Sequence, residues 1–197
     1  MALSLNFLTV FALLSAVVGL FTFAPYIRDI FSLKTTPHSY SWLIWATLQI
    51  TGAIAMFNSN AGWGITPLVL GAALCVSVFL LSLKYGTKNI TRFDAICLAS
   101  ALAVFCFYLV TKEALVSVIL VSVIDVIGFL PTFRKAYEEP YSETVSTYVL
   151  SAVADGLALG ALSSFSLTTT LYLFTLIVVD SACSIMILRR RHKLRRV

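Results

Sequence analysis

Residues 21–31 read FTFAPYIRDIF, and residues 127–137 read IGFLPTFRKAY. An offset of 106 residues places Pro25 on Pro131 and Arg28 on Arg134. The same offset aligns the segment at 41–44, Ser-Trp-Leu-Ile, with Thr-Tyr-Val-Leu at 147–150. Because the register holds without a gap over about 60 positions, the matches indicate an internal duplication.

The composition predicts an all-α membrane protein. The chain is 59% hydrophobic and 12% charged, whereas a soluble domain is about 25% charged. Its 197 residues leave no room for a separate soluble domain beside one bundle. The net charge of +5 gathers in residues 189–197, beside an apolar segment, so no nucleic-acid partner is predicted. The four cysteines lie in apolar segments without metal-ligand spacing, which predicts small core residues and neither a metal nor a cofactor.

Seven apolar segments have about the 20 residues that a membrane-crossing helix needs. Turn residues or charges separate them. The first segment lacks the basic start of a signal peptide and has a counterpart deep in the chain, so we expect it to be a mature span. The predicted spans are 5–27, 39–58, 63–83, 93–111, 114–133, 145–165 and 168–188.

The basic residues predict the orientation of these spans. The connections after spans one, three and five, together with the C-terminal segment, hold 13 of the 14 Lys and Arg residues, and only Lys112 lies on the other side. Because basic loops stay in the cytoplasm, we expect a cytoplasmic C-terminus and an outside N-terminus. The host would be a bacterial inner membrane or an organelle membrane.

The duplication maps spans one to three onto spans five to seven and leaves span four as a linker. Both copies then have the same orientation, and are parallel repeats related by an axis along the membrane normal. The predicted organisation is 3+1+3. Its parts are a first triple-helix repeat at 1–91, a linker helix at 92–111, a second repeat at 112–190 and a basic cytoplasmic tail at 191–197.

This architecture, with a proline near the cytoplasmic end of the first helix of each unit, resembles the PQ-loop superfamily. That group includes the SWEET sugar transporters, the cystinosin-like transporters and, more distantly, the KDEL receptors. Both prolines are present, but Tyr26 and Thr132 replace the glutamines that name the family. Spans three and seven also lack the asparagine of SWEET sugar sites. The resemblance implies alternating access with Pro25 and Pro131 as hinges, and the alternative is that each proline marks a helix end.

Three acidic residues inside predicted spans give the clearest indication of function in the sequence. Asp125, Asp155 and Asp180 lie near the midpoints of spans five, six and seven. An ionised carboxylate at mid-membrane costs about 2.5–3.5 kcal/mol, and no span holds a Lys or Arg to pair with it. We therefore expect these groups to be protonated, solvated by a cavity, or bound to a cation. For any single one, a structural role capped by a neighbouring helix is the alternative.

The first repeat has Gly19, Gln49 and Leu74 at the three positions of the acids. Helical spacing places Gln49 on one face of span two and Asp155 on one face of span six. These faces predict an aromatic-walled cavity for a small polar or cationic solute, although Trp42 also fits an interfacial belt. The two faces are Trp42, Trp45, Gln49, Gly52 and Met56, and Tyr148, Ser151, Asp155, Ala158 and Leu162.

These patterns favour an alternating-access transporter of a small, amino-acid-like polar or cationic solute, coupled to protons. Asp125, Asp155 and Asp180 would carry protons or hold a cation, and Gln49, Trp45, Tyr148 and Ser151 would bind the substrate. Arg28 and Arg134 are interpreted as topology anchors or as a cytoplasmic gate. The alternatives are a membrane receptor with pH-dependent ligand binding and a SWEET-like sugar facilitator.

An enzyme is not predicted, because no His lies in a span and no nucleophile has an evident base. Span seven lacks the lysine that retinal would need. The expected partners are a small molecule, protons and the lipid bilayer, and a homo-oligomer is left open.

Overall fold

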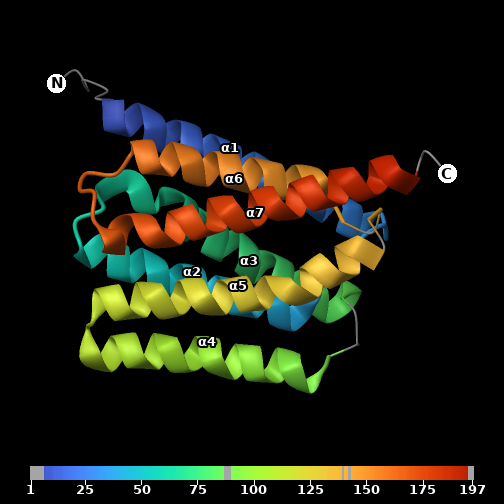
Figure 1. Cartoon of the computed structure of the whole chain (residues 1–197), viewed down its shortest axis with the longest axis horizontal. Coiled ribbons are helices and arrows are strands. Elements are labelled where there is room, and N and C mark those ends of the chain that lie inside the picture. Colours follow the sequence, from blue (N-terminus) through green and yellow to red (C-terminus); the bar gives the residue numbers. More distant parts are fainter. Residues whose placement is uncertain (1–6, 87–89, 139, 142, 195–197) are drawn as a thin grey trace.

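The computed structural model describes residues 7–86, 90–138, 140–141 and 143–194, apart from the side chains of Pro131, Arg134 and Lys135. The described residues form helices and no strand, with the helices lying side by side (Figure 1). The elements are α1 (Phe7–Phe31), α2 (Ser39–Asn58), the 3₁₀-helix η1 (Gly62–Ile65), α3 (Thr66–Tyr85), α4 (Arg92–Thr111), α5 (Ala114–Glu138), α6 (Val145–Gly160) and α7 (Leu167–Leu194).

Five of the described helical segments are long and apolar enough to cross a membrane: α1, α2, η1 with α3, α4 and α7. The apolar parts of α5 and α6 are shorter, at Ala114–Leu130 and Val145–Gly160. The all-α class is therefore confirmed for the described residues, and the apolar helices are consistent with the predicted membrane protein. The predicted span at 145–165 is too long, because α6 ends at Gly160.

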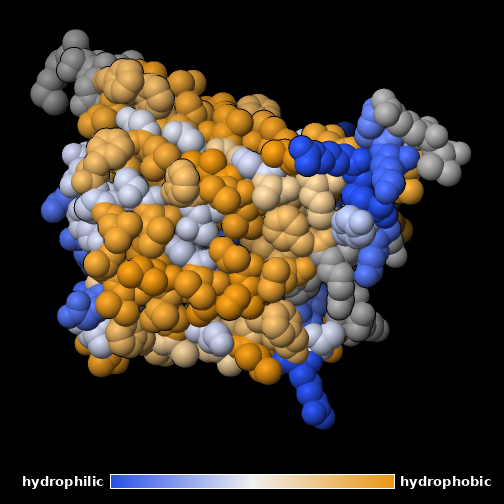
Figure 2. Space-filling view, in the orientation of Figure 1, coloured by the Kyte–Doolittle hydropathy of each residue, from blue (hydrophilic) through white to orange (hydrophobic). Residues whose placement is uncertain are grey.

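The outer surface of the bundle is apolar rather than polar. Large hydrophobic side chains such as Leu13, Phe21 and Val110 are exposed on the outward faces of the helices. Figure 2 shows this apolar surface as a broad area, with hydrophilic residues gathered at its edges. Such a surface is stable against hydrocarbon and unfavourable in water, as expected of an integral membrane protein.

We call α1, α2 and α3 the first group of helices and α5, α6 and α7 the second group. Helix α3 contacts both α1 and α2, and α7 contacts both α5 and α6. The groups meet where α1 packs on α6 and where α2 packs on α5, while α4 contacts α2 and α5. The largest core cluster lies between the groups and includes Leu48, Leu68, Val121 and Tyr172.

Polar residues fix the starts of α2 and α4. His38 caps α2, its Nδ1 accepting from the Ser41 backbone N–H at 3.4 Å. Thr91 and Asp94 form a capping box at the start of α4, and the His38 Nε2 lies 3.4 Å from an Asp94 carboxylate oxygen. Pro67 lies in the first turn of α3, where a proline is tolerated because its missing N–H would have no partner in the helix.

The two prolines of the repeat lie inside helices. Helix α1 continues beyond Pro25 to Phe31, and α5 runs through position 131 to Glu138. The alternative that each proline marks a helix end is therefore wrong. The predicted tail at 191–197 also differs, because α7 continues to Leu194, and 195–197 lie outside the described residues.

Candidate solute cavity

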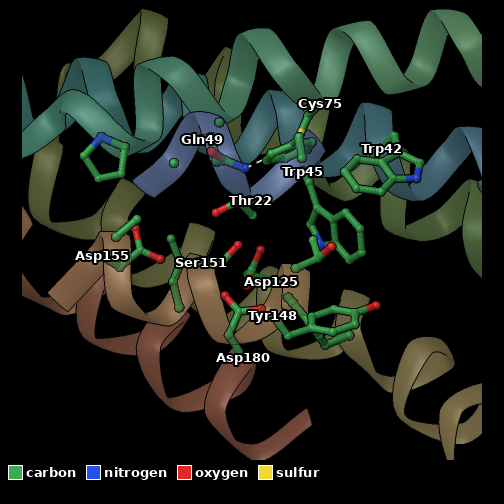
Figure 3. Close-up of a pocket in the computed structure, with 18 residues that line it drawn as sticks. Thr22, Trp42, Trp45, Gln49, Cys75, Asp125, Tyr148, Ser151, Asp155 and Asp180 are labelled. Carbon is green, nitrogen blue, oxygen red and sulfur yellow. Dashed lines mark hydrogen bonds between the residues drawn. The ribbon is translucent and has the colours of Figure 1, made fainter. Parts of the chain in front are cut away.

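A cavity of about 90 Å³ lies between the two groups of helices. Residues from α1, α2 and α3 line one side, and residues from α5, α6 and α7 line the other. Every residue predicted to bind substrate or protons lines this cavity, as Figure 3 shows. They are Trp45, Gln49, Asp125, Tyr148, Ser151, Asp155 and Asp180.

The three aspartates form an acidic wall on the second group of helices. Asp125 comes from α5, Asp155 from α6 and Asp180 from α7, and each side chain lies on the side that faces the cavity (Figure 3). Asp125 is 1% exposed, and neither of its carboxylate oxygens has a hydrogen-bond partner among the described residues. The Tyr172 hydroxyl lies beside Asp125, but the two groups do not meet hydrogen-bond geometry.

The opposite wall is neutral and is centred on Gln49. Its side-chain Nε2 donates to the Cys75 Sγ at 3.4 Å, which links α2 to α3. Gly71 gives the Gln49 amide its space, because a Cβ at that position would overlap the amide oxygen. A small residue on α3 thus positions a polar group on α2.

Aromatic rings connect the two walls. The ring centroids of Trp42 and Trp45 lie 5.1 Å apart, and those of Trp45 and Phe129 lie 5.2 Å apart. Phe129 in turn lies 6.4 Å from Tyr148. Because aromatic faces attract cations, this series gives the cavity a second feature that suits a positively charged solute.

Polar contacts near Tyr148 join the start of α6 to the residues before it and to α1. The Tyr148 hydroxyl donates to the Glu143 carboxylate at 2.8 Å. Next to it, the Thr144 hydroxyl donates at 3.1 Å to Asp29, which joins the N-terminus of α6 to the end of α1. Thr144 is the N-cap residue of α6, yet its side chain caps no α6 N–H and contacts α1 instead.

Of the two predicted gate residues, Arg28 lies outside the described cavity lining. Arg28 is largely exposed and pairs with its neighbour Asp29, with a 3.1 Å distance between the Arg28 Nη2 and the carboxylate. The Arg134 side chain is not among those described. Arg191, at the end of α7, holds the loop before α6 by donating to the Pro140 and Glu143 carbonyls at 2.9 and 2.7 Å.

Some residues on the predicted faces do not reach the cavity. Met56, Ala158 and Leu162 pack in the core cluster, and Gly52 lies against the Tyr172 ring. Both faces therefore line the cavity over only part of their length, because the two helix groups pack directly against each other over the remainder. The prediction that the whole faces form the cavity is wrong.

The sequence argument missed several lining residues, including Thr22, Phe23, Cys75, Phe129 and Thr147. Phe23 and Phe129 occupy equivalent positions of the duplication, so the repeat itself carried a signal for them. Cys75 and Thr147 had none, because their placement depends on how neighbouring helices rotate.

The acidic wall does not form a metal site. Among the described residues, no group of three or more His, Cys, Asp and Glu side chains is placed to hold a metal ion. Comparison of the chain with models of known families, with curated proteins and with solved structures found no match.

Proposed function

We propose that this chain is an alternating-access membrane transporter of a small polar or cationic solute, coupled to protons through Asp125, Asp155 and Asp180. The observation that carries the proposal is the cavity itself. It lies at the boundary between two helix groups, and three buried acids from three different helices line it. Transporters built from repeats place their substrate sites at such a boundary.

The packing of the helices supports the 3+1+3 organisation. Exchanging α1 with α5, α2 with α6 and α3 with α7 converts each contact between these helices into another observed contact. The α1 contact with α6, for example, becomes the α5 contact with α2. This symmetry is what two parallel repeats around the linker α4 would produce, and it favours the resemblance to the PQ-loop superfamily.

The placement of Pro25 supports a hinge. A proline inside a helix removes one backbone hydrogen bond and weakens the helix at that turn. Pro25 lies beyond the middle of α1, close to the end that carries Asp29. Bending there would move Asp29 away from Thr144 and open that end of the cavity, and position 131 would serve α5 in the same way.

The proposed orientation places the end of the cavity near Tyr148 on the cytoplasmic side. The basic residues at the ends of α1, α3, α5 and α7 favour this arrangement. The N-terminus would then be outside, in a bacterial inner membrane or an organelle membrane. Arg191 would hold the cytoplasmic loop before α6 through the Pro140 and Glu143 carbonyls, and Arg190 would bind the Tyr137 carbonyl at the end of α5.

The test is solute-dependent proton flux in liposomes that contain the purified chain and a trapped pH-sensitive dye. Amino acids, amines, polyamines and sugars are added singly to an imposed pH gradient. We expect at least one to accelerate proton entry, and Asp155→Asn to abolish the effect while the protein elutes as a folded species. Unchanged pH-dependent flux in that variant would contradict the proposal.

A receptor for an anionic ligand has less support. Such a site needs Lys or Arg side chains to bind the anion, and none of the described residues that line the cavity is basic. Ligand binding without any solute flux in the same liposomes would favour the receptor.

A further inference from the structure

The hydrogen-bonding groups around the cavity are unequally divided between acceptors and donors. Three carboxylates supply acceptor oxygens. Three of the potential donors already have partners within the protein: Thr22 donates to the Val18 carbonyl at 3.0 Å, Tyr148 to Glu143 at 2.8 Å, and Gln49 to Cys75 at 3.4 Å. The Thr147 hydroxyl has none among the described residues and can donate or accept. The described lining contains no Lys, Arg or His. The cavity therefore favours a ligand that donates hydrogen bonds and carries positive charge.

Asp125 indicates where such a ligand would bind. Its carboxylate is almost fully buried, faces the cavity and has no hydrogen-bond partner among the described residues. The Thr147 hydroxyl, also buried in the cavity lining, has no partner there either. Buried polar groups are nearly always hydrogen-bonded, so two without partners beside one cavity point to a ligand that completes them.

The same acids argue against a ligand with a carboxylate of its own. A substrate carboxylate would face three acidic side chains, with no basic group in the described lining to bind it. Like charges at short range in a poorly solvated site repel strongly. An amino acid would therefore be less favourable than an amine of the same size.

Three further observations narrow the chemical class of the ligand. The aromatic series from Trp42 to Tyr148 offers ring faces to an organic cation. No group of three or more His, Cys, Asp and Glu side chains among the described residues could hold a metal ion. The volume of about 90 Å³ is smaller than the roughly 150 Å³ of a cavity that holds benzene, so the occupant in this conformation would have about four non-hydrogen atoms.

We propose that the cavity binds a compact organic cation without a carboxylate group, such as guanidinium or a short alkylammonium ion. The cation would lie between Asp125, Asp155 and Asp180 on one side and Trp45 and Gln49 on the other. This inference names the substrate class of the proposed transporter, and its binding test does not depend on transport.

Tryptophan fluorescence gives a direct measurement of binding. Trp42 and Trp45 line the cavity, whereas Trp63, the remaining tryptophan of three, is exposed in η1. Trp63→Phe therefore leaves only the two cavity tryptophans as reporters. The full-length variant in lipid nanodiscs is titrated with guanidinium, propylammonium, urea and glycine at constant ionic strength, with potassium chloride as the salt control.

Urea and glycine are matched controls, because urea is the neutral counterpart of guanidinium and glycine adds a carboxylate at similar size. We expect guanidinium and propylammonium to change the emission saturably, with a Kd at least about tenfold lower than those of urea and glycine. Asp155→Asn and Asp180→Asn should each raise that Kd about tenfold. Glu113→Gln, which alters an exposed acid outside the cavity, should leave it unchanged.

The proposal would be overturned if glycine or urea bound as tightly as the cations, if no cation bound, or if both aspartate variants kept the wild-type affinity. Two independent aspartate variants keep the test decisive where one fails to fold. Transport is then scored separately. Cation binding without proton-driven flux contradicts the transporter and leaves the ligand class standing, whereas proton-driven glycine flux without cation binding contradicts the ligand class alone.

Discussion

The two walls of the cavity come from helices that the predicted duplication makes equivalent, yet their chemistry differs. The first wall has Gln49 where the second has Asp155, and Gly19 where the second has Asp125. The phenylalanines at 23 and 129 are the same in both. The shared residues build the shape of the cavity, and the residues that differ supply its charge. A solute between the walls would be held by carboxylates on one side and by neutral groups on the other.

The strongest test of this comparison exchanges the polar groups of the two walls. Asp155→Gln should reduce proton-coupled flux about 100-fold, because about 2.7 kcal/mol of interaction with the coupling ion or solute is lost. Adding Gln49→Asp to that variant returns a carboxylate to the opposite wall and should recover part of the flux. Liposome flux measurements of both single variants and of the double variant would decide.

The double variant also gives the outcome that would contradict the comparison. Full recovery of the flux would mean that only the number of acids matters and that the wall carrying them does not. No recovery, with both proteins folded by size-exclusion chromatography, would mean that Asp155 acts through its position on α6.

The next largest effect should come from a feature that the repeats share. Pro25→Ala restores the backbone hydrogen bond to the Phe21 carbonyl and stiffens α1. We expect a higher melting temperature together with flux about tenfold slower. Pro37→Ala, in the loop between α1 and α2, is the control because that proline interrupts no helix. Equal effects of the two substitutions would contradict the hinge.

A smaller effect is expected where the neutral wall depends on close packing. Gly71→Ala would displace the Gln49 amide, since the new methyl group would overlap it. The tip of a flexible side chain can move, so we expect the fold to be retained and solute affinity to fall about threefold. Gly156→Ala on α6 meets nothing within 4 Å and is the matched control. A similar loss of affinity in both variants would argue against a role for Gln49.

The smallest effect on flux should come from the contact between α1 and the start of α6. Thr144→Val keeps the side-chain shape and removes the hydroxyl that donates to Asp29. A partly exposed hydrogen bond contributes about 0.5 kcal/mol, so flux should change about twofold. Thr175→Val, whose hydroxyl bonds only within its own helix, serves as the control. Identical rates in both variants would show that the α1–α6 contact does not limit opening.

Much of this picture follows from the sequence, because apolar runs and mid-span charges carry strong signals. The seven predicted segments each correspond to an α-helix, and the three acids share one cavity as expected. Helix ends were less predictable. Neither Pro25 nor Pro131 stops its helix, since the local cost of a proline can be offset by packing, which sequence alone does not reveal.

The extent of the cavity along the helices could not be predicted from the sequence either. Helical spacing places Trp42, Gln49 and Met56 on one face, but only the first two line the cavity. Met56 is fully buried in the core because the two groups of helices pack directly against each other at its level. That contact depends on the tilt of whole helices, which residue spacing cannot define.

The length of α6 has a consequence for the surrounding lipid. Its 16 residues extend about 24 Å, whereas a typical hydrocarbon core is about 30 Å thick. A bilayer adapts to a short helix by thinning around it, at a cost that grows with the mismatch. Because α6 carries Ser151 and Asp155, acyl chain length would act on the helix that holds the site. Membrane thickness would thus adjust the depth of Asp155, and a cell could tune this protein by changing its lipids.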